Sequence, residues 1–132
     1  MALSLGFIGI VATDLAASLS FYRDLGVAIP DVVEGEDHVD ATLPDGTTLA
    51  WDTRELIQRL DPSYQLPHGG HRVALAFKLD APVEVDTLYG HLIAAGHAGK
   101  VAPWDAFWGQ RYASICDPDG NVIDLYAMLP AS

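Results

Sequence analysis

The sequence has little cysteine, few basic residues and no long apolar run, and each shortage excludes a class of protein. Cys116 is the only cysteine among 132 residues, so an internal disulfide and a disulfide-stabilised secreted scaffold are excluded. No apolar stretch reaches the roughly 18 residues that a membrane-spanning helix needs. The first basic residue, Arg23, follows the apolar N-terminal segment, whereas a signal peptide carries its basic residues before that segment. We therefore expect a cytoplasmic protein without membrane contact.

The shortage of basic residues also bears on partners. The chain has 7 Lys and Arg against 18 Asp and Glu, a net charge of −11 at pH 7. Nucleic acids are bound largely through clustered cationic side chains that release counterions from phosphates, and such clusters are missing. Nucleic acid is therefore not an expected partner. Half of the residues are hydrophobic and 19% are charged, which is typical of one folded domain with a real core.

The first half of the chain alternates between strand and helix patterns. Asp14 can cap a helix whose apolar residues recur at steps of three and four, and Gly26 stands where that helix would end. Pro, Asp and Gly at 44–46 predict a tight turn, and a short helix is expected at 54–60. The strands expected in this half cover residues 3–12, 27–33, 38–43 and 47–51.

The second half repeats this order. Asp80 and Pro82 open a predicted helix, and Gly96 closes it. A second Pro-Asp-Gly turn occupies 118–120, and an aromatic loop is expected at 104–108. The strands expected in this half cover residues 72–79, 100–103, 111–116 and 121–128.

Two copies of strand, helix and three strands predict one α+β domain over residues 1–132. Its first module covers 1–60 and its second module covers 71–132. The segment 61–70, with two Pro and two Gly, is expected to link them. The repeat is the main architectural prediction from the residues themselves.

Two segments resemble motifs of the vicinal oxygen chelate superfamily, which includes glyoxalase I, bleomycin-resistance proteins and extradiol dioxygenases. They are IGIVATDLAASLSFYRDLG at 8–26 and WGQRYASICDPDGNVIDLY at 108–126. The resemblance implies a pair of βαβββ modules, each curling its sheet into part of a cleft that is commonly completed in a homodimer. Function varies widely on this scaffold, so the fold does not settle it.

The resemblance also implies four metal-ligand positions, one on the first and one on the last strand of each module. Enzymes of the superfamily place His or Glu there, around a divalent metal that keeps an open position for substrate. In this chain the four positions are Phe7, Ala50, Ala74 and Asp124, and Arg72 lies on the same strand face as Ala74. One carboxylate does not hold a transition metal, and none of the five His residues shows a spacing that restores the site. The prediction is therefore no metal and no cofactor.

Aromatic residues cluster where the family's cleft is expected. Flat rings offer large contact areas with few rotors, which suits the capture of a planar or cationic molecule. Asp124 is expected to face the same cleft. The predicted ligand-binding residues are Phe7, Arg72, Ala74, Trp104, Phe107, Trp108, Tyr112 and Asp124.

Three hypotheses follow. The first is a metal-free binding protein of the bleomycin-resistance kind that sequesters an aromatic or cationic ligand, and the acidic chain favours a cation. The second is a metal-dependent lyase, isomerase or dioxygenase related to glyoxalase I, which needs at least two donors that the sequence does not supply. The third is a cofactor-free enzyme in which Asp124 acts as general base and Arg72 steadies an anion.

Overall fold

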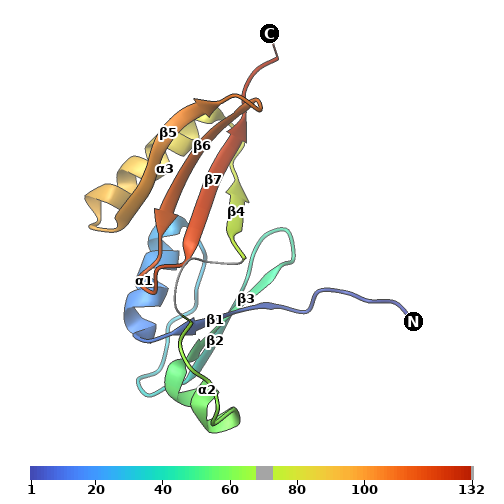
Figure 1. Cartoon of the computed structure of the whole chain (residues 1–132), viewed down its shortest axis with the longest axis vertical. Coiled ribbons are helices and arrows are strands. Elements are labelled where there is room, and N and C mark those ends of the chain that lie inside the picture. The colour runs from blue at the N-terminus through green and yellow to red at the C-terminus, as the bar shows by residue number, and fades with distance from the viewer. Residues whose placement is uncertain (68–72, 132) are drawn as a thin grey trace. The chain divides into compact units, whose positions relative to one another are not determined.

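The computed structural model describes residues 1–67 and 73–131 and divides the chain into two compact units, Met1–His68 and Gly69–Ser132. Each unit has its own sheet, with strand order β1-β3-β2 in the first and β4-β7-β6-β5 in the second (Figure 1). Three helices occur in the described residues. The predicted α+β class is confirmed.

The first unit is built on a three-stranded sheet. β1 runs parallel to the central strand β3, and β2 runs antiparallel to it. Helix α1 packs on β3, and helix α2 contacts β1 and β3. The elements are β1 (Ile8–Ala12), α1 (Leu15–Leu25), β2 (His38–Thr42), β3 (Thr48–Thr53) and α2 (Arg54–Leu60).

Helix α1 begins and ends where the sequence predicts. The Asp14 carboxylate accepts a hydrogen bond from the Ala17 backbone N–H at 3.1 Å, which satisfies one of the free donors of the first turn. Gly26 ends the helix with φ 120°, a conformation that favours glycine. Tyr22 packs edge-on against Trp51 of β3, with ring centroids 5.3 Å apart, and both side chains are fully buried. The core of the first unit therefore lies between α1 and one face of its sheet.

The strand predicted at 27–33 is wrong. The structure has no strand in this stretch, so the first module has three strands rather than four. Pro30 lies in the middle of the stretch and has no backbone N–H to donate to a ladder. Its carbonyl accepts a hydrogen bond from Arg23 Nη2 at 2.7 Å, which holds this part of the chain beside α1.

The turn between β2 and β3 forms as predicted. The Gly46 N–H donates to the Leu43 carbonyl at 2.9 Å, and Gly46 has φ 90°. Helix α2 also forms where it was expected, and Thr53 caps it by accepting from the Leu56 N–H at 3.1 Å. β1 is shorter than the apolar run that predicted it, because residues 3–7 lie outside the sheet.

The second unit has the predicted strand, helix and three strands. β4 runs parallel to β7, and the other two pairs are antiparallel. Helix α3 packs on β5, β6 and β7 and so covers one face of this sheet (Figure 1). The elements are β4 (Leu75–Lys78), α3 (Pro82–Ala94), β5 (Ala98–Ala106), β6 (Gln110–Cys116) and β7 (Val122–Met128).

The details of this unit depart from the sequence prediction at two places. Ala81 rather than Asp80 is the N-cap of α3, and its N–H donates to the Glu84 carboxylate at 2.8 Å. β5 covers nine residues with two register shifts, so Trp104 belongs to a strand and not to a loop. The turn at 118–120 forms as predicted, because the Asp117 carboxylate accepts from the backbone N–H groups of its neighbours.

Candidate ligand-binding face

The candidate site lies on the face of the second sheet that α3 does not cover. Successive side chains of a strand point to opposite faces. In β7, Ile123 and Leu125 are fully buried, whereas Asp124 and Tyr126 alternate with them and are half-buried. The pairing of β6 with β7 places Ser114 opposite Asp124 on the same face.

Asp124 is held by two hydroxyl donors. Ser114 Oγ donates to Oδ1 at 2.7 Å, and Tyr112 Oη donates to Oδ2 at 2.8 Å. Burial raises the pKa of Tyr112 to about 12, and its hydrogen bond to Asp124 adds to the rise. The phenol therefore stays protonated at neutral pH and remains a donor to the carboxylate.

A row of aromatic rings leads to this carboxylate. Trp104 packs edge-on against Trp108 with centroids 5.5 Å apart, and Trp108 packs on Tyr112 at 5.4 Å. Tyr112 stacks on Tyr126, with centroids 6.1 Å apart. Trp108 Nε1 donates to Gln110 Oε1 at 2.7 Å, which fixes the plane of the indole. Trp104 and Trp108 remain 39% and 47% exposed, so the row offers ring surface to a ligand.

Four predicted residues are thus brought together: Trp104, Trp108, Tyr112 and Asp124. Phe107 is 92% exposed at the hairpin between β5 and β6 and touches the row through Trp108, at a centroid distance of 4.9 Å.

The remaining predicted residues do not join this cluster. Ala74 is exposed just before β4, and Ala76, two residues later, is the residue that pairs with Asp124. Phe7 belongs to the first unit, where it is 60% exposed and precedes β1. Arg72 lies outside the described residues.

Sequence reasoning missed Ser114 and Tyr126. Both could have been found by counting outward from the turn at 118–120, because the antiparallel pairing places Ser114 opposite Asp124 and Tyr112 opposite Tyr126. Alternation along β6 and β7 then puts all four side chains on one face.

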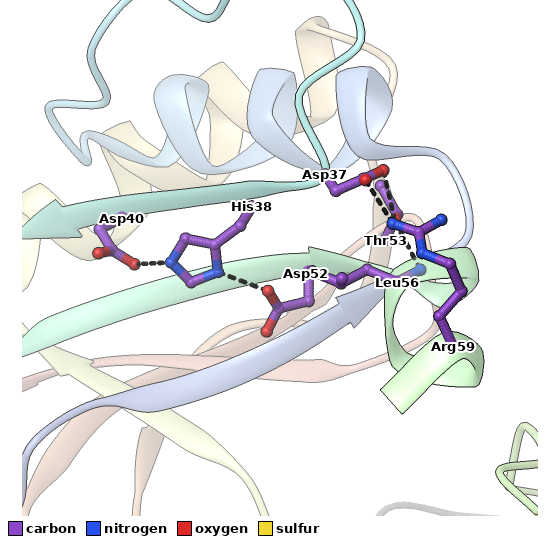
Figure 2. Close-up of polar contacts among 7 residues, drawn as sticks. All are labelled: Asp37, His38, Asp40, Asp52, Thr53, Leu56 and Arg59. Carbon is purple, nitrogen blue, oxygen red and sulfur yellow. Dashed lines mark hydrogen bonds and ion pairs between the residues drawn. The ribbon is translucent and has the colours of Figure 1, made fainter. Parts of the chain in front are cut away.

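A second polar cluster, also missed, lies on the first sheet (Figure 2). His38 stands between two carboxylates, with Nδ1 2.5 Å from Asp52 Oδ1 and Nε2 2.6 Å from Asp40 Oδ1. The hydrogen bond to Asp52 raises the pKa of His38 above 6.5, against a smaller opposing effect of burial, and Asp40 adds to the rise. This cluster could also have been found from the alternation of side chains across a hairpin, because β2 and β3 pair His38 directly with Asp52.

Comparisons with known proteins agree with this α+β fold. The model of the Glyoxalase/Bleomycin resistance protein/Dioxygenase superfamily matches residues 4–125. The chain belongs to this superfamily. One similar solved structure is a glyoxalase/bleomycin resistance protein/dioxygenase from Nocardioides, with 28% identity over 100% of this chain and 87% of that one and a TM-score of 0.79. A glyoxalase-related enzyme from Fulvimarina pelagi has 24% identity over 96% of this chain and 88% of its own, with a TM-score of 0.80. A glyoxalase/bleomycin resistance protein/dioxygenase family enzyme from Burkholderia phytofirmans PsJN has 23% identity over 93% of this chain and 97% of its own, with a TM-score of 0.76.

The last two likenesses are below 25% identity and show the fold alone. No match is found among proteins of curated function. No helix in the described part of the chain is long and apolar enough to cross a bilayer. The shared fold does not settle the function of a superfamily member, which depends on its own side chains.

The metal that the superfamily implies does not fit the residues that stand at the four ligand positions given by the resemblance. The four ligand positions hold a phenyl ring, two methyl groups and the Asp124 carboxylate, whose oxygens already accept from Tyr112 and Ser114. In residues 1–67 and 73–131, no three His, Cys, Asp or Glu side chains are placed to hold a metal ion. The His38 cluster does not replace the site, because both ring nitrogens already have a carboxylate partner.

Proposed function

We propose that this superfamily member is a metal-free binding protein that captures a small aromatic or cationic molecule on the α3-free face of its second sheet. The observation that carries the proposal is the half-buried Asp124 carboxylate, held by Tyr112 and Ser114 at the end of a partly exposed aromatic row. A bleomycin-resistance type of sequestration needs such a recognition surface and no reaction chemistry.

The chemistry of the face favours a ligand that is both flat and positively charged. A carboxylate has about four lone-pair directions, and the two hydroxyl donors leave room for a ligand ammonium group. The rings of Trp104 and Trp108 attract a cation by their electron-rich faces and a planar ring by stacking. The net charge of −11 raises the local concentration of cations further.

Calorimetric titration with a charge-matched pair of probes tests the proposal. We expect protonated 2-naphthylmethylamine to bind more tightly than the neutral 2-naphthylmethanol. Asp124→Asn should remove the preference for the amine, and Trp108→Ala should weaken both probes. Asp45→Asn, which changes an exposed turn carboxylate of the first unit, is the matched control. Equal affinities of the two probes for the natural protein would contradict the role of Asp124.

The alternative is a metal-dependent enzyme of the glyoxalase or dioxygenase type, and the similar structure from Fulvimarina pelagi is that of a glyoxalase-related enzyme. Elemental analysis of protein purified without chelators separates the two. The binding-protein proposal would be overturned by a stoichiometric divalent metal that a chelator removes and that the protein takes up again, if enzymatic activity is lost and regained with the metal.

The proposal includes a homodimer, because clefts of this superfamily are commonly completed between subunits. Light scattering coupled to gel filtration should give twice the chain mass, and a monomer that still binds the amine would show that one subunit suffices.

A further inference from the structure

A strap of residues 31–36 lies beside α1 where the predicted strand is missing. The strap is fixed at both ends. Before it, the Pro30 carbonyl is bound by Arg23 of α1 at 2.7 Å. After it, the Asp37 carboxylate accepts from Arg59 at 2.6 Å, and the Asp37 carbonyl accepts from the Thr53 N–H at 2.9 Å (Figure 2).

Between the strap and α1 lies an open hollow of about 590 Å³. Ligand sites of small molecules commonly have volumes of about 300–1,000 Å³. The described residues that line the hollow all belong to the first unit, so the hollow shares no residue with the face that carries Asp124.

The lining of the hollow combines apolar side chains with an excess of negative charge. The apolar side chains are Leu15, Ala16 and Leu19 of α1 and Val32 and Val33 of the strap. The strap contributes three carboxylates, from Asp31, Glu34 and Glu36.

Among the described residues, Arg23 is the one cationic side chain in the lining, and its Nη2 donates to the Pro30 carbonyl. Three carboxylates attract a cation more strongly than one guanidinium repels it, whereas an anion is repelled on balance. An apolar body is favoured as well, because the aliphatic side chains in the lining offer it contacts that exclude water.

We propose that the hollow beneath the strap binds a small organic cation, a primary ammonium group carried on an apolar body. The apolar body lies against Leu15, Ala16 and Leu19 of α1, and the ammonium group faces the carboxylates of the strap. This site does not depend on the proposed function, because none of its residues belongs to the second unit.

Amide chemical-shift titration of the ¹⁵N-labelled full chain tests the site. The probes are 2-phenylethylammonium, neutral 2-phenylethanol and anionic 3-phenylpropionate, which share a ring and differ in charge. We expect saturable shifts in residues 15–36 with the ammonium probe, weaker shifts with the alcohol and none with the carboxylate. Shifts confined to residues 104–126 would overturn the hollow while supporting the Asp124 face, so the two proposals fail separately.

Two variants sharpen the result. Replacing Glu34 and Glu36 together by Gln should weaken the ammonium probe about fivefold, as expected for exposed ion pairs, and leave the alcohol unchanged. Ala16→Phe, which fills the hollow from an exposed helix position, should abolish binding of both probes. Asp45→Asn is the control. An ammonium affinity that survives both changes would overturn the proposal, as would shifts that grow linearly without saturation.

Discussion

The three strands of the first sheet and β4, β7 and β6 of the second share an order and a register but carry different chemistry on the same face. In each, the first strand runs parallel to the last, and the last pairs antiparallel with the strand before it. Gly9 pairs with Ala50 in the first sheet as Ala76 pairs with Asp124 in the second.

From this match, Tyr112, Ser114, Asp124 and Tyr126 each have a counterpart in the first unit. His38 opposite Asp52 corresponds to Tyr112 opposite Tyr126, and Asp40 opposite Ala50 corresponds to Ser114 opposite Asp124. One backbone plan thus carries an ionic cluster in one unit and a carboxylate among hydroxyls and rings in the other. The comparison teaches that side chains, and not the shared strand order, decide what each face can bind.

The largest change in the free energy of unfolding should come from substitutions at the core positions that correspond in the two sheets. Trp51 and Leu125 are both fully buried on the helix-covered faces. We expect Trp51→Ala to lower the free energy of unfolding by about 3–5 kcal/mol and Leu125→Ala by about 2–5 kcal/mol, because each leaves a cavity. Urea denaturation followed by circular dichroism measures both. Losses below about 1 kcal/mol would show that the sites relax and that these side chains are not central to the core.

Transplanting the carboxylate tests the comparison directly. Ala50→Asp should destabilise the protein by about 1–3 kcal/mol, because Ala50 is 1% exposed and Asp40 stands opposite it where the second sheet has Ser114. Adding Asp40→Ser should recover part of the loss by removing the like charge and supplying a hydroxyl. Urea denaturation of the single and double variants gives the coupling, and a double variant less stable than the single one would contradict the correspondence.

Removing the donors of Asp124 should have a smaller effect. Tyr112→Phe and Ser114→Ala each delete one hydrogen bond to a half-buried carboxylate, and we expect losses of about 1–2 kcal/mol. Thermal unfolding measures the loss. In the natural protein, ultraviolet titration should show tyrosine ionisation that extends to about pH 12, and the amplitude of this late phase should fall by one tyrosine in Tyr112→Phe.

The smallest effect concerns the ionic cluster of the first sheet. Because the pKa of His38 is raised in the folded protein, its contribution to stability is fully present below pH 6.5 and is lost as the pH rises through the raised value. His38 is 47% exposed, so we expect the contribution to stay below about 1 kcal/mol.

Urea denaturation of the natural protein and His38→Gln between pH 5 and pH 9 measures this contribution. The stability difference should shrink with rising pH. Asp52→Asn should return the His38 pKa, followed by proton NMR, toward its ordinary value. A His38 pKa unchanged by this substitution would show that Asp52 does not stabilise the imidazolium.

Much of the second unit could be predicted because its boundaries depend on local chemistry. The turn at 118–120 and the end of α3 at Gly96 follow from residues within one turn of chain. In the first unit, the apolar pattern at 27–33 pointed to a strand, but Pro30 and the bond from Arg23 outweighed it. That bond joins residues in a helix and a loop, and no periodicity reveals it.

The sequence alone was enough to determine the superfamily and the α+β class, through two motifs and a repeated order of elements. It also determined the ends of α1 and the two Pro-Asp-Gly turns, because the hydrogen bonds of caps and turns are made with neighbours a few residues away. Only the tertiary structure decided that Ser114 and Tyr112 hold Asp124, that His38 lies between Asp40 and Asp52, and that a hollow opens beside α1. These depend on which strands pair and in what register, and pairing is set by the packing of the whole sheet.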